Sequence, residues 1–449
     1  MTSLGPIFAD DLARIKPGDR LRLTISAQTS DAAALAQAAL EARARGERVL
    51  VVCADPADVP RLAQEMPWFE PKLDVRPLPD WETLPYDVLS PQEELVSERL
   101  EALYRLTAPT AGADVLLTSA VTASQRLSPV SYIGANTFFF HQGEQISLTT
   151  LQKRLAAAGY ANVKQVLAAG EFAVRGSIVD VFPMGSERPF RLDFFDDEIE
   201  SIRWFDVDTQ RSMESAEEIR LLPGHEFPVD PEALLAFRQR WRREFAGDPK
   251  KSIVYCDIEK EILPPGIEYY LPLFFDETAA LTDYLPPNAR VFLLGDIEVA
   301  LQAFGRDMAS RYKVLAADPQ RPALAPERIW LKPEEFFKSL ANFARFTVEK
   351  KENAEDLKRL TGIEVDRKSQ NPVGKLLERT RESAMKGVRT LIAAPSAGRM
   401  ETMSQLLRTG GLSVEEFPDW QTFLDADSSL GIAAAPLFSG AVFHHPEIV

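Results

Sequence analysis

The feature that most constrains the fold is a strand, a helix and a second strand that follow one another near the start of the chain. Residues 21–27, LRLTISA, alternate as a strand does, and the alanine-rich stretch 32–45 reads as a helix that ends at Gly46. Residues 49–53, VLVVC, form a continuous apolar run, which is typical of a parallel strand buried on both faces. The three segments predict a βαβ unit and therefore an α/β domain built on a parallel sheet.

The turn between the first strand and the first helix is where such domains hold phosphates, using glycine backbone N–H groups and a lysine. Here the turn reads SAQTSDAAAL, residues 26–35, and it has neither glycine nor lysine. Alanines stand at the lysine position, and Asp31 adds a negative charge where a triphosphate would lie. We therefore predict a degenerate site that binds no ATP, although a plain helix-capping Asp31 is an equal alternative. The altered positions are Ser26, Ser30, Asp31, Ala32 and Ala33.

The pattern of predicted helices, strands and charged stretches divides the chain into four parts. Its 449 residues leave room for about three domains. Residues 1–136 and 224–345 alternate helices with buried strands and predict the α/β body, which a strand-rich α+β insert at 137–223 interrupts. Residues 346–371 are highly charged without an apolar period and predict a linker. Residues 372–449 predict a small α/β domain, which stops just past a strand and so suggests a truncated end.

Composition excludes several classes of function. The 67 acidic residues outnumber the 51 basic residues and give a net charge of -16, which opposes non-specific DNA binding. Cys53 and Cys256 are too far apart for a zinc site or a disulfide framework, and the four histidines show no metal-ligand spacing, so we expect no metal. We find neither a secretory signal nor an apolar stretch long enough for a membrane helix, and we expect a cytoplasmic protein without a membrane partner.

The insert contains the stretch ERPFRLDFFDDEIESIRWFD, residues 187–206, which predicts two strands joined by an acidic turn. Alternate residues of the first strand form an apolar face, and Arg191, Asp193 and Phe195 form the other face. An exposed aromatic ring beside an arginine and a carboxylate has the composition of a binding hot spot. The alternative is an ordinary surface pair, with Phe195 folded under the turn.

Several long strings of this sequence resemble the N-terminal part of the bacterial transcription-repair coupling factors. The resemblance covers 1–345, as a helicase-like module similar to the excision-repair protein UvrB, and 372–449, as the small domain that follows it. This chain differs from UvrB in its degenerate phosphate turn and in lacking a long aromatic hairpin that grips DNA. The strings are LPDWETLPYDVLSP (78–91), GEFAVRGSIVDVFP (170–183), RLDFFDDEIESIRWFDVDTQRS (191–212), LLPGHEFP (221–228) and GIEYY (266–270).

The resemblance implies a non-catalytic module that recruits UvrA to stalled RNA polymerase in nucleotide excision repair. It implies that the insert binds UvrA, with contacts from Arg175, Arg191, Asp193 and Phe195. It also implies that this region needs no cofactor, because the ATP- and Mg²⁺-dependent motor lies in missing C-terminal domains. RNA polymerase, double-stranded DNA and an autoinhibitory C-terminal domain are the further partners implied for the full-length protein.

Two rival hypotheses belong to other classes. The chain could be an ATP-dependent helicase fragment with an unorthodox nucleotide site, a reading opposed by the missing lysine. It could instead be a DNA-binding module that uses a run of arginines on a predicted helix, although a solvated helix face explains such a run equally well. The arginines are Arg238, Arg240, Arg242 and Arg243.

Overall fold

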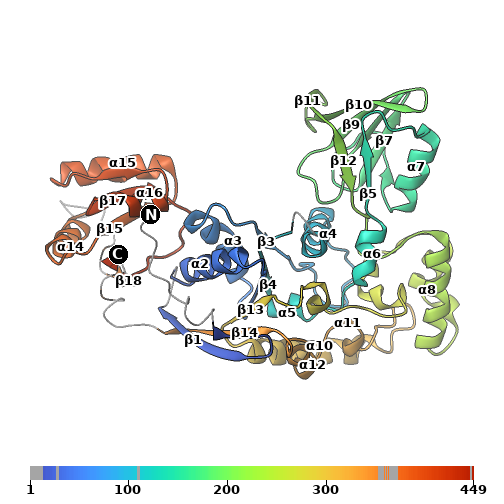
Figure 1. The fold of residues 1–449 in the computed structure, drawn as a ribbon. Helices are drawn as coiled ribbons and strands as arrows, with labels where there is room; N and C mark the ends of the chain where they lie inside the picture. Colours follow the sequence, from blue (N-terminus) through green and yellow to red (C-terminus); the bar gives the residue numbers. More distant parts are fainter. Residues whose placement is uncertain are drawn as a thin grey trace.

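The computed structural model describes residues 14–26, 30–108, 112–351, 358, 360–361, 363, 373–444 and 447–448. They form a mixed α/β protein in which an inserted domain and a small domain lie at opposite ends of a central body (Figure 1). Of the helices described, none is both long enough and apolar enough to cross a membrane.

The body is organised around a six-stranded sheet in which every neighbouring pair of strands is parallel. Its order is β1 (Arg20–Ser26), β14 (Ala344–Lys351), β13 (Arg290–Leu294), β2 (Val49–Cys53), β4 (Val115–Ser119) and β3 (Val75–Pro77). The central strands are apolar because both faces are covered. Val51 of β2 packs in the core beside α2 and α3, whereas its neighbour Val52 packs in the core beside α4.

Helices cover both faces of this sheet (Figure 1). The helix after β1 begins at Ser30, so Asp31 lies within its first turn and not at the position before it. Its alanines are small enough to let the helix approach the sheet closely, and Ala32 and Ala33 are buried. The helices of the body are α2 (Ser30–Ala44), α3 (Asp58–Phe69), α4 (Glu93–Thr107), α5 (Ala120–Ala123), α6 (Val130–Ala135), α8 (Pro231–Glu244), α9 (Ile253–Glu259), α10 (Ile297–Leu315), α11 (Pro326–Ile329) and α12 (Pro333–Ser339), with short 3₁₀ helices η1 (Pro249–Lys251), η2 (Ile267–Leu273) and η3 (Leu281–Tyr284).

The inserted domain leaves the body after α6 and returns to it before α8. Its main sheet has the order β11-β10-β9-β8-β7-β6, and β5 pairs separately with β12. One face of the main sheet packs into the core shared with the body, and the other face is only partly covered. The elements are β5 (Phe138–His141), α7 (Leu148–Ala157), β6 (Ala161–Asn162), β7 (Glu171–Arg175), β8 (Ile178–Val181), β9 (Phe190–Phe195), β10 (Glu198–Phe205), β11 (Ser212–Ala216) and β12 (Glu218–Leu221).

The small domain is a parallel sheet of order β15-β17-β16 with three helices, and it packs on α3 of the body. Phe69 of α3 meets Trp420 and Phe443 with ring centroids 5.4 and 6.2 Å apart. Its elements are α14 (Gly374–Met385), β15 (Thr390–Ala394), α15 (Ala397–Thr409), β16 (Glu415–Phe417), α16 (Trp420–Asp425), β17 (Leu430–Ala434), β18 (Phe443–His444) and β19 (Glu447–Ile448).

One boundary predicted from the sequence is wrong. The linker predicted to start at residue 346 begins inside β14, which pairs with β1 on one side and with β13 on the other. Phe346 and Val348 are buried. The charged residues that follow form the end of the strand, where the side chains become exposed. The high charge of 349–351 therefore concealed the end of a strand within the sheet.

Candidate functional site

The hairpin of β9 and β10 presents an aromatic ring to solvent. Phe190, Leu192 and Phe194 of β9 are buried, as their alternation predicted. Phe195 ends the strand with 69% of its surface exposed, so it is not folded under the turn. Asp196 then adopts φ 51°, in the left-handed region, and the chain reverses into β10.

The register of four strands brings the predicted contact residues onto one face. Arg175 of β7 lies opposite Ile178 of β8, and Ile178 lies opposite Asp193 of β9. Asp193 in turn lies opposite Ser201, whose hydroxyl donates to the carboxylate of Asp193 at 2.8 Å. We call this surface the outer face, defined by Arg175, Arg191, Asp193, Phe195 and Arg203.

The side chain of Arg191 is bound by a carboxylate of the neighbouring strand β8. Its Nε and Nη2 donate to the two carboxylate oxygens of Asp180 at 2.7 and 2.9 Å, and the Asp180 side chain is almost fully buried. The guanidinium lies over the ring of Phe205, 4.9 Å from its centroid. These hydrogen bonds from Arg191 to Asp180 raise the pKa of the guanidinium. Arg191 is thus half-buried and already paired within the domain.

Arg175 is the more available of the two arginines. It is exposed, and its Nη2 donates one long hydrogen bond to the backbone oxygen of Lys164 at 3.3 Å. Arg203 is a further arginine on this surface, which the sequence analysis did not single out. The register places it directly across from Arg191, on the outer face, because β10 contains an irregularity between Ile199 and Ser201.

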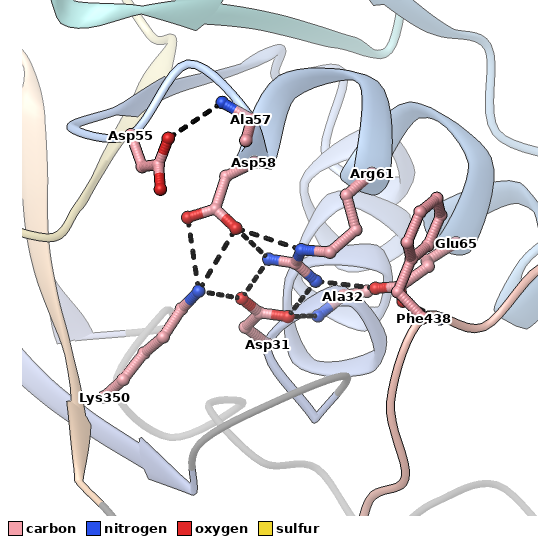
Figure 2. Close-up of polar contacts among 9 residues, drawn as sticks. All are labelled: Asp31, Ala32, Asp55, Ala57, Asp58, Arg61, Glu65, Lys350 and Phe438. Atoms are coloured by element: carbon pink, nitrogen blue, oxygen red, sulfur yellow. Dashed lines mark hydrogen bonds and ion pairs between the residues drawn. The ribbon is translucent and has the colours of Figure 1, made fainter.

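The predicted nucleotide site contains a charge cluster, which we define as Asp31, Asp58, Arg61, Glu65 and Lys350 (Figure 2). Asp31 and Glu65 are buried, and the other three side chains are partly exposed. The Asp31 side chain has no exposed surface. Its carboxylate accepts hydrogen bonds from Arg61 at 2.6 and 2.8 Å and from the Ala32 backbone N–H at 2.7 Å. A carboxylate in the first turn of a helix is favoured by the helix dipole.

Lys350 comes to this cluster from the end of β14, opposite Ile25 of β1. Its Nζ lies 2.8 Å from Asp31 and 3.2 Å from Asp58. Burial acts to lower the pKa of Lys350, but Asp31 and Asp58 outweigh burial and raise it. Sequence reasoning found no lysine for this site because it assigned residue 350 to a linker. The run of alternating apolar residues before it, ARFTV, is the signal that could have located the strand.

Arg61 joins the cluster from α3, where it is spaced to pair along its own helix. It donates to Asp58 at 2.9 Å and to Glu65 at 2.6 Å. The other oxygen of Glu65 accepts the backbone N–H of Phe438 at 2.9 Å, which ties the small domain to the cluster (Figure 2). Both cations that could attract phosphate are therefore already bound to carboxylates.

The remaining predicted positions of the nucleotide site form part of β1 and α2. Ser26 ends β1, Ser30 opens α2, and Ala32 and Ala33 are buried against the sheet. In the described part of the chain, no group of three His, Cys, Asp or Glu side chains could hold a metal ion.

The arginine run on α8 is mostly engaged within the body. Arg238 lies 3.7 Å from Glu259, and Arg240 lies 2.6 Å from Asp276. Arg242 lies over the ring of Tyr255 at 5.5 Å. Arg243 remains exposed. The run is therefore largely a set of intramolecular contacts, which weakens the hypothesis of a DNA-binding helix.

Comparisons with known proteins match two regions of the chain. Residues 138–227 match the UvrB interaction domain, and residues 384–449 match the D3 domain of MFD. The first match contains the whole outer face, and the second contains most of the small domain.

Curated relatives share the same name. The transcription-repair-coupling factor of Escherichia coli strain K12 is 42% identical over 298 residues, which are 66% of this chain and 26% of the relative. That of Haemophilus influenzae is 40% identical over 344 residues, 74% of this chain and 29% of the relative. That of Bacillus subtilis is 32% identical over 216 residues, 44% of this chain and 18% of the relative. The chain thus spans less than a third of the length of these relatives.

Proposed function

We propose that this chain, a homologue of the amino-terminal part of the transcription-repair-coupling factors, is a non-catalytic module that recruits UvrA in transcription-coupled DNA repair. The inserted domain is the binding element. Within a full-length protein, this module would serve partners that lie outside the chain: RNA polymerase, double-stranded DNA, and a C-terminal domain that masks the outer face.

The observation that carries the proposal is the exposure of Phe195, at 69%, on the domain that matches the UvrB interaction domain. A large aromatic side chain that is left in water costs free energy unless a partner covers it. Arg175, exposed on the same face, supplies a guanidinium for charge-assisted hydrogen bonds to that partner. A ring flanked by an arginine is the composition of a hot spot.

The absence of catalysis and of a cofactor is part of the same proposal. Asp31 stands where phosphate would lie, and its charge is balanced by Arg61 and Lys350. A triphosphate would have to compete with this carboxylate for the two cations and would meet its repulsion. We expect no saturable binding of a fluorescent ATP analogue at micromolar protein, measured by anisotropy. Saturable binding abolished by Lys350→Met would overturn this part.

The recruitment function is tested by isothermal titration of purified UvrA into this chain and into the Phe195→Ala variant. We expect the variant to lose about 2 kcal/mol of binding free energy, because truncating a hot-spot ring removes its buried area. The matched control is Phe438→Ala, which truncates a phenylalanine that is 66% exposed in the small domain. Equal affinity of the wild type and Phe195→Ala would remove the assignment, and equal losses in both variants would remove its location.

A further inference from the structure

The outer face has two electrostatic ends. At one end lies Arg203 of β10, directly across from Arg191 of β9; we call residues that lie opposite one another on neighbouring strands a row. The Arg203 side chain is exposed and has no hydrogen bond, ion pair or ring contact with any described residue. Arg175 of β7 is level with Asp193, between the two ends, and donates to a neutral group, the backbone carbonyl of Lys164. Because Asp180 already balances Arg191, the uncompensated positive charge at this end belongs to Arg203.

At the other end lies the acidic hairpin tip, which we define as Asp196, Asp197 and Glu198. All three are exposed. Glu198 accepts a hydrogen bond from the neutral amide of Gln145 at 2.8 Å, and the carboxylates of Asp196 and Asp197 have no partner among the described residues. The tip therefore carries negative charge without a balancing cation.

The exposed ring separates these two ends. Along β9 the row of Arg191 lies about 13 Å from the row of Phe195, at roughly 3.3 Å per residue. That separation exceeds the Debye length of about 8 Å at physiological ionic strength, so a partner meets two distinct patches of charge and not their average. Asp193, which lies between them, is turned toward Ser201 by its hydrogen bond.

We propose that the binding partner of the outer face is polarised in the opposite sense, and that Arg203 and the acidic hairpin tip fix the direction in which it lies across the strands. This inference rests on the proposed function. The partner presents a carboxylate to Arg203, an apolar pocket to Phe195, and lysines or arginines to the hairpin tip. Phe195 then supplies affinity, whereas the charged ends supply register and rate of association.

Charge reversal at each end tests this arrangement. The variants are Arg203→Glu and Asp197→Lys, titrated with purified UvrA at low and at physiological ionic strength. We expect each change to weaken binding by about tenfold at low ionic strength and by less when salt screens the charges. The control is Arg243→Glu, which reverses an exposed arginine on α8, and it should bind as the wild type does.

The two single changes also distinguish a polarised partner from a uniformly charged one. If the partner surface were acidic throughout, Asp197→Lys would strengthen binding. If it were basic throughout, Arg203→Glu would strengthen binding. Either result, or no effect of Arg203→Glu, overturns the inference.

The Phe195→Ala variant separates this inference from the proposed function. Loss of affinity in Phe195→Ala with none in Arg203→Glu contradicts the polarity alone, whereas no loss in Phe195→Ala contradicts recruitment through this face. Should Arg203→Glu disturb the hairpin, as judged by circular dichroism, Arg203→Gln removes the charge while keeping a long side chain. It should then weaken binding about threefold at low ionic strength, and unchanged binding would again overturn the inference.

Discussion

Arg191 and Arg203 lie directly opposite each other, and a single neighbour makes their roles different. Arg191 has the buried carboxylate of Asp180 within hydrogen-bonding distance, whereas Arg203 has no such partner among the described residues. A guanidinium that balances a buried carboxylate contributes to the fold as well as to any interface. A loss of binding on truncation of Arg191 is therefore not evidence of direct contact until stability has been measured.

We expect Arg191→Ala to lower the free energy of unfolding by about 3 kcal/mol, because it leaves Asp180 buried without a counter-charge. Arg203→Ala is the matched control on the facing strand and should stay within about 0.5 kcal/mol of the wild type. Urea unfolding followed by circular dichroism measures both. Similar losses in the two variants would contradict the distinct role given to Arg191.

Asp31 is the second residue whose role depends on the charged side chains around it. Asp31→Asn keeps the shape of the side chain but removes the charge that balances Arg61 and Lys350. We expect a loss of about 3 kcal/mol in the free energy of unfolding, measured by urea titration. Asp55→Asn is the control, since Asp55 precedes α3 but is exposed, and its carboxylate accepts the Ala57 N–H. A loss no larger than that of the control would show that the charge cluster contributes little to stability.

At the scale of one element, η2 carries an ionisable group in an unfavourable place. Burial raises the pKa of Glu268 from 4.5 to about 7, even though its carboxylate accepts the hydroxyl of Ser90 at 2.9 Å. The folded state therefore holds this proton more tightly than the unfolded state does. Stability from this group is present below about pH 4.5 and is lost as pH rises toward the folded pKa near 7.

Glu268→Gln should remove that loss, because glutamine has no charge to bury. Relative to the wild type, we expect the variant to gain about 2 kcal/mol between pH 5 and pH 8, an order-of-magnitude figure from the raised pKa. Thermal unfolding at the two values of pH measures the difference. The same gap between wild type and variant at both values would contradict the raised pKa.

At the scale of the whole molecule, an aromatic contact between α3 and the small domain determines whether the chain behaves as one unit. Phe69 is buried between Trp420 and Phe443. We expect Phe69→Ala to cost about 3 to 5 kcal/mol of docking and packing energy. Calorimetry should then show a separate unfolding transition for the small domain at lower temperature.

Phe438→Ala provides the contrast for this experiment. Its side chain is mostly exposed, and its link to Glu65 is through the backbone N–H, which alanine keeps. It should unfold as the wild type does. A single shared transition in Phe69→Ala at an unchanged temperature would show that these rings do not hold the two parts together.

The amino-acid sequence was sufficient for features that depend on near neighbours. The alternation of β9 placed Phe195 on the face opposite Phe194, and the apolar run of β2 marked a strand buried on both sides. The resemblance to the coupling factors was also recognisable from long strings of the sequence, and the comparisons match transcription-repair-coupling factors. Strand parity and helix periodicity are local properties, so they survive without knowledge of the rest of the fold.

Only the tertiary structure decided which distant charges meet. Asp180 reaches Arg191 through the register of β8 with β9, and an irregularity in β10 turned Arg203 to the outer face. Lys350 reaches Asp31 because β14 pairs with β1 in the sheet, although the two residues lie about 320 positions apart in the chain. Pairing of this kind is set by sheet order and register, which no short stretch of sequence specifies.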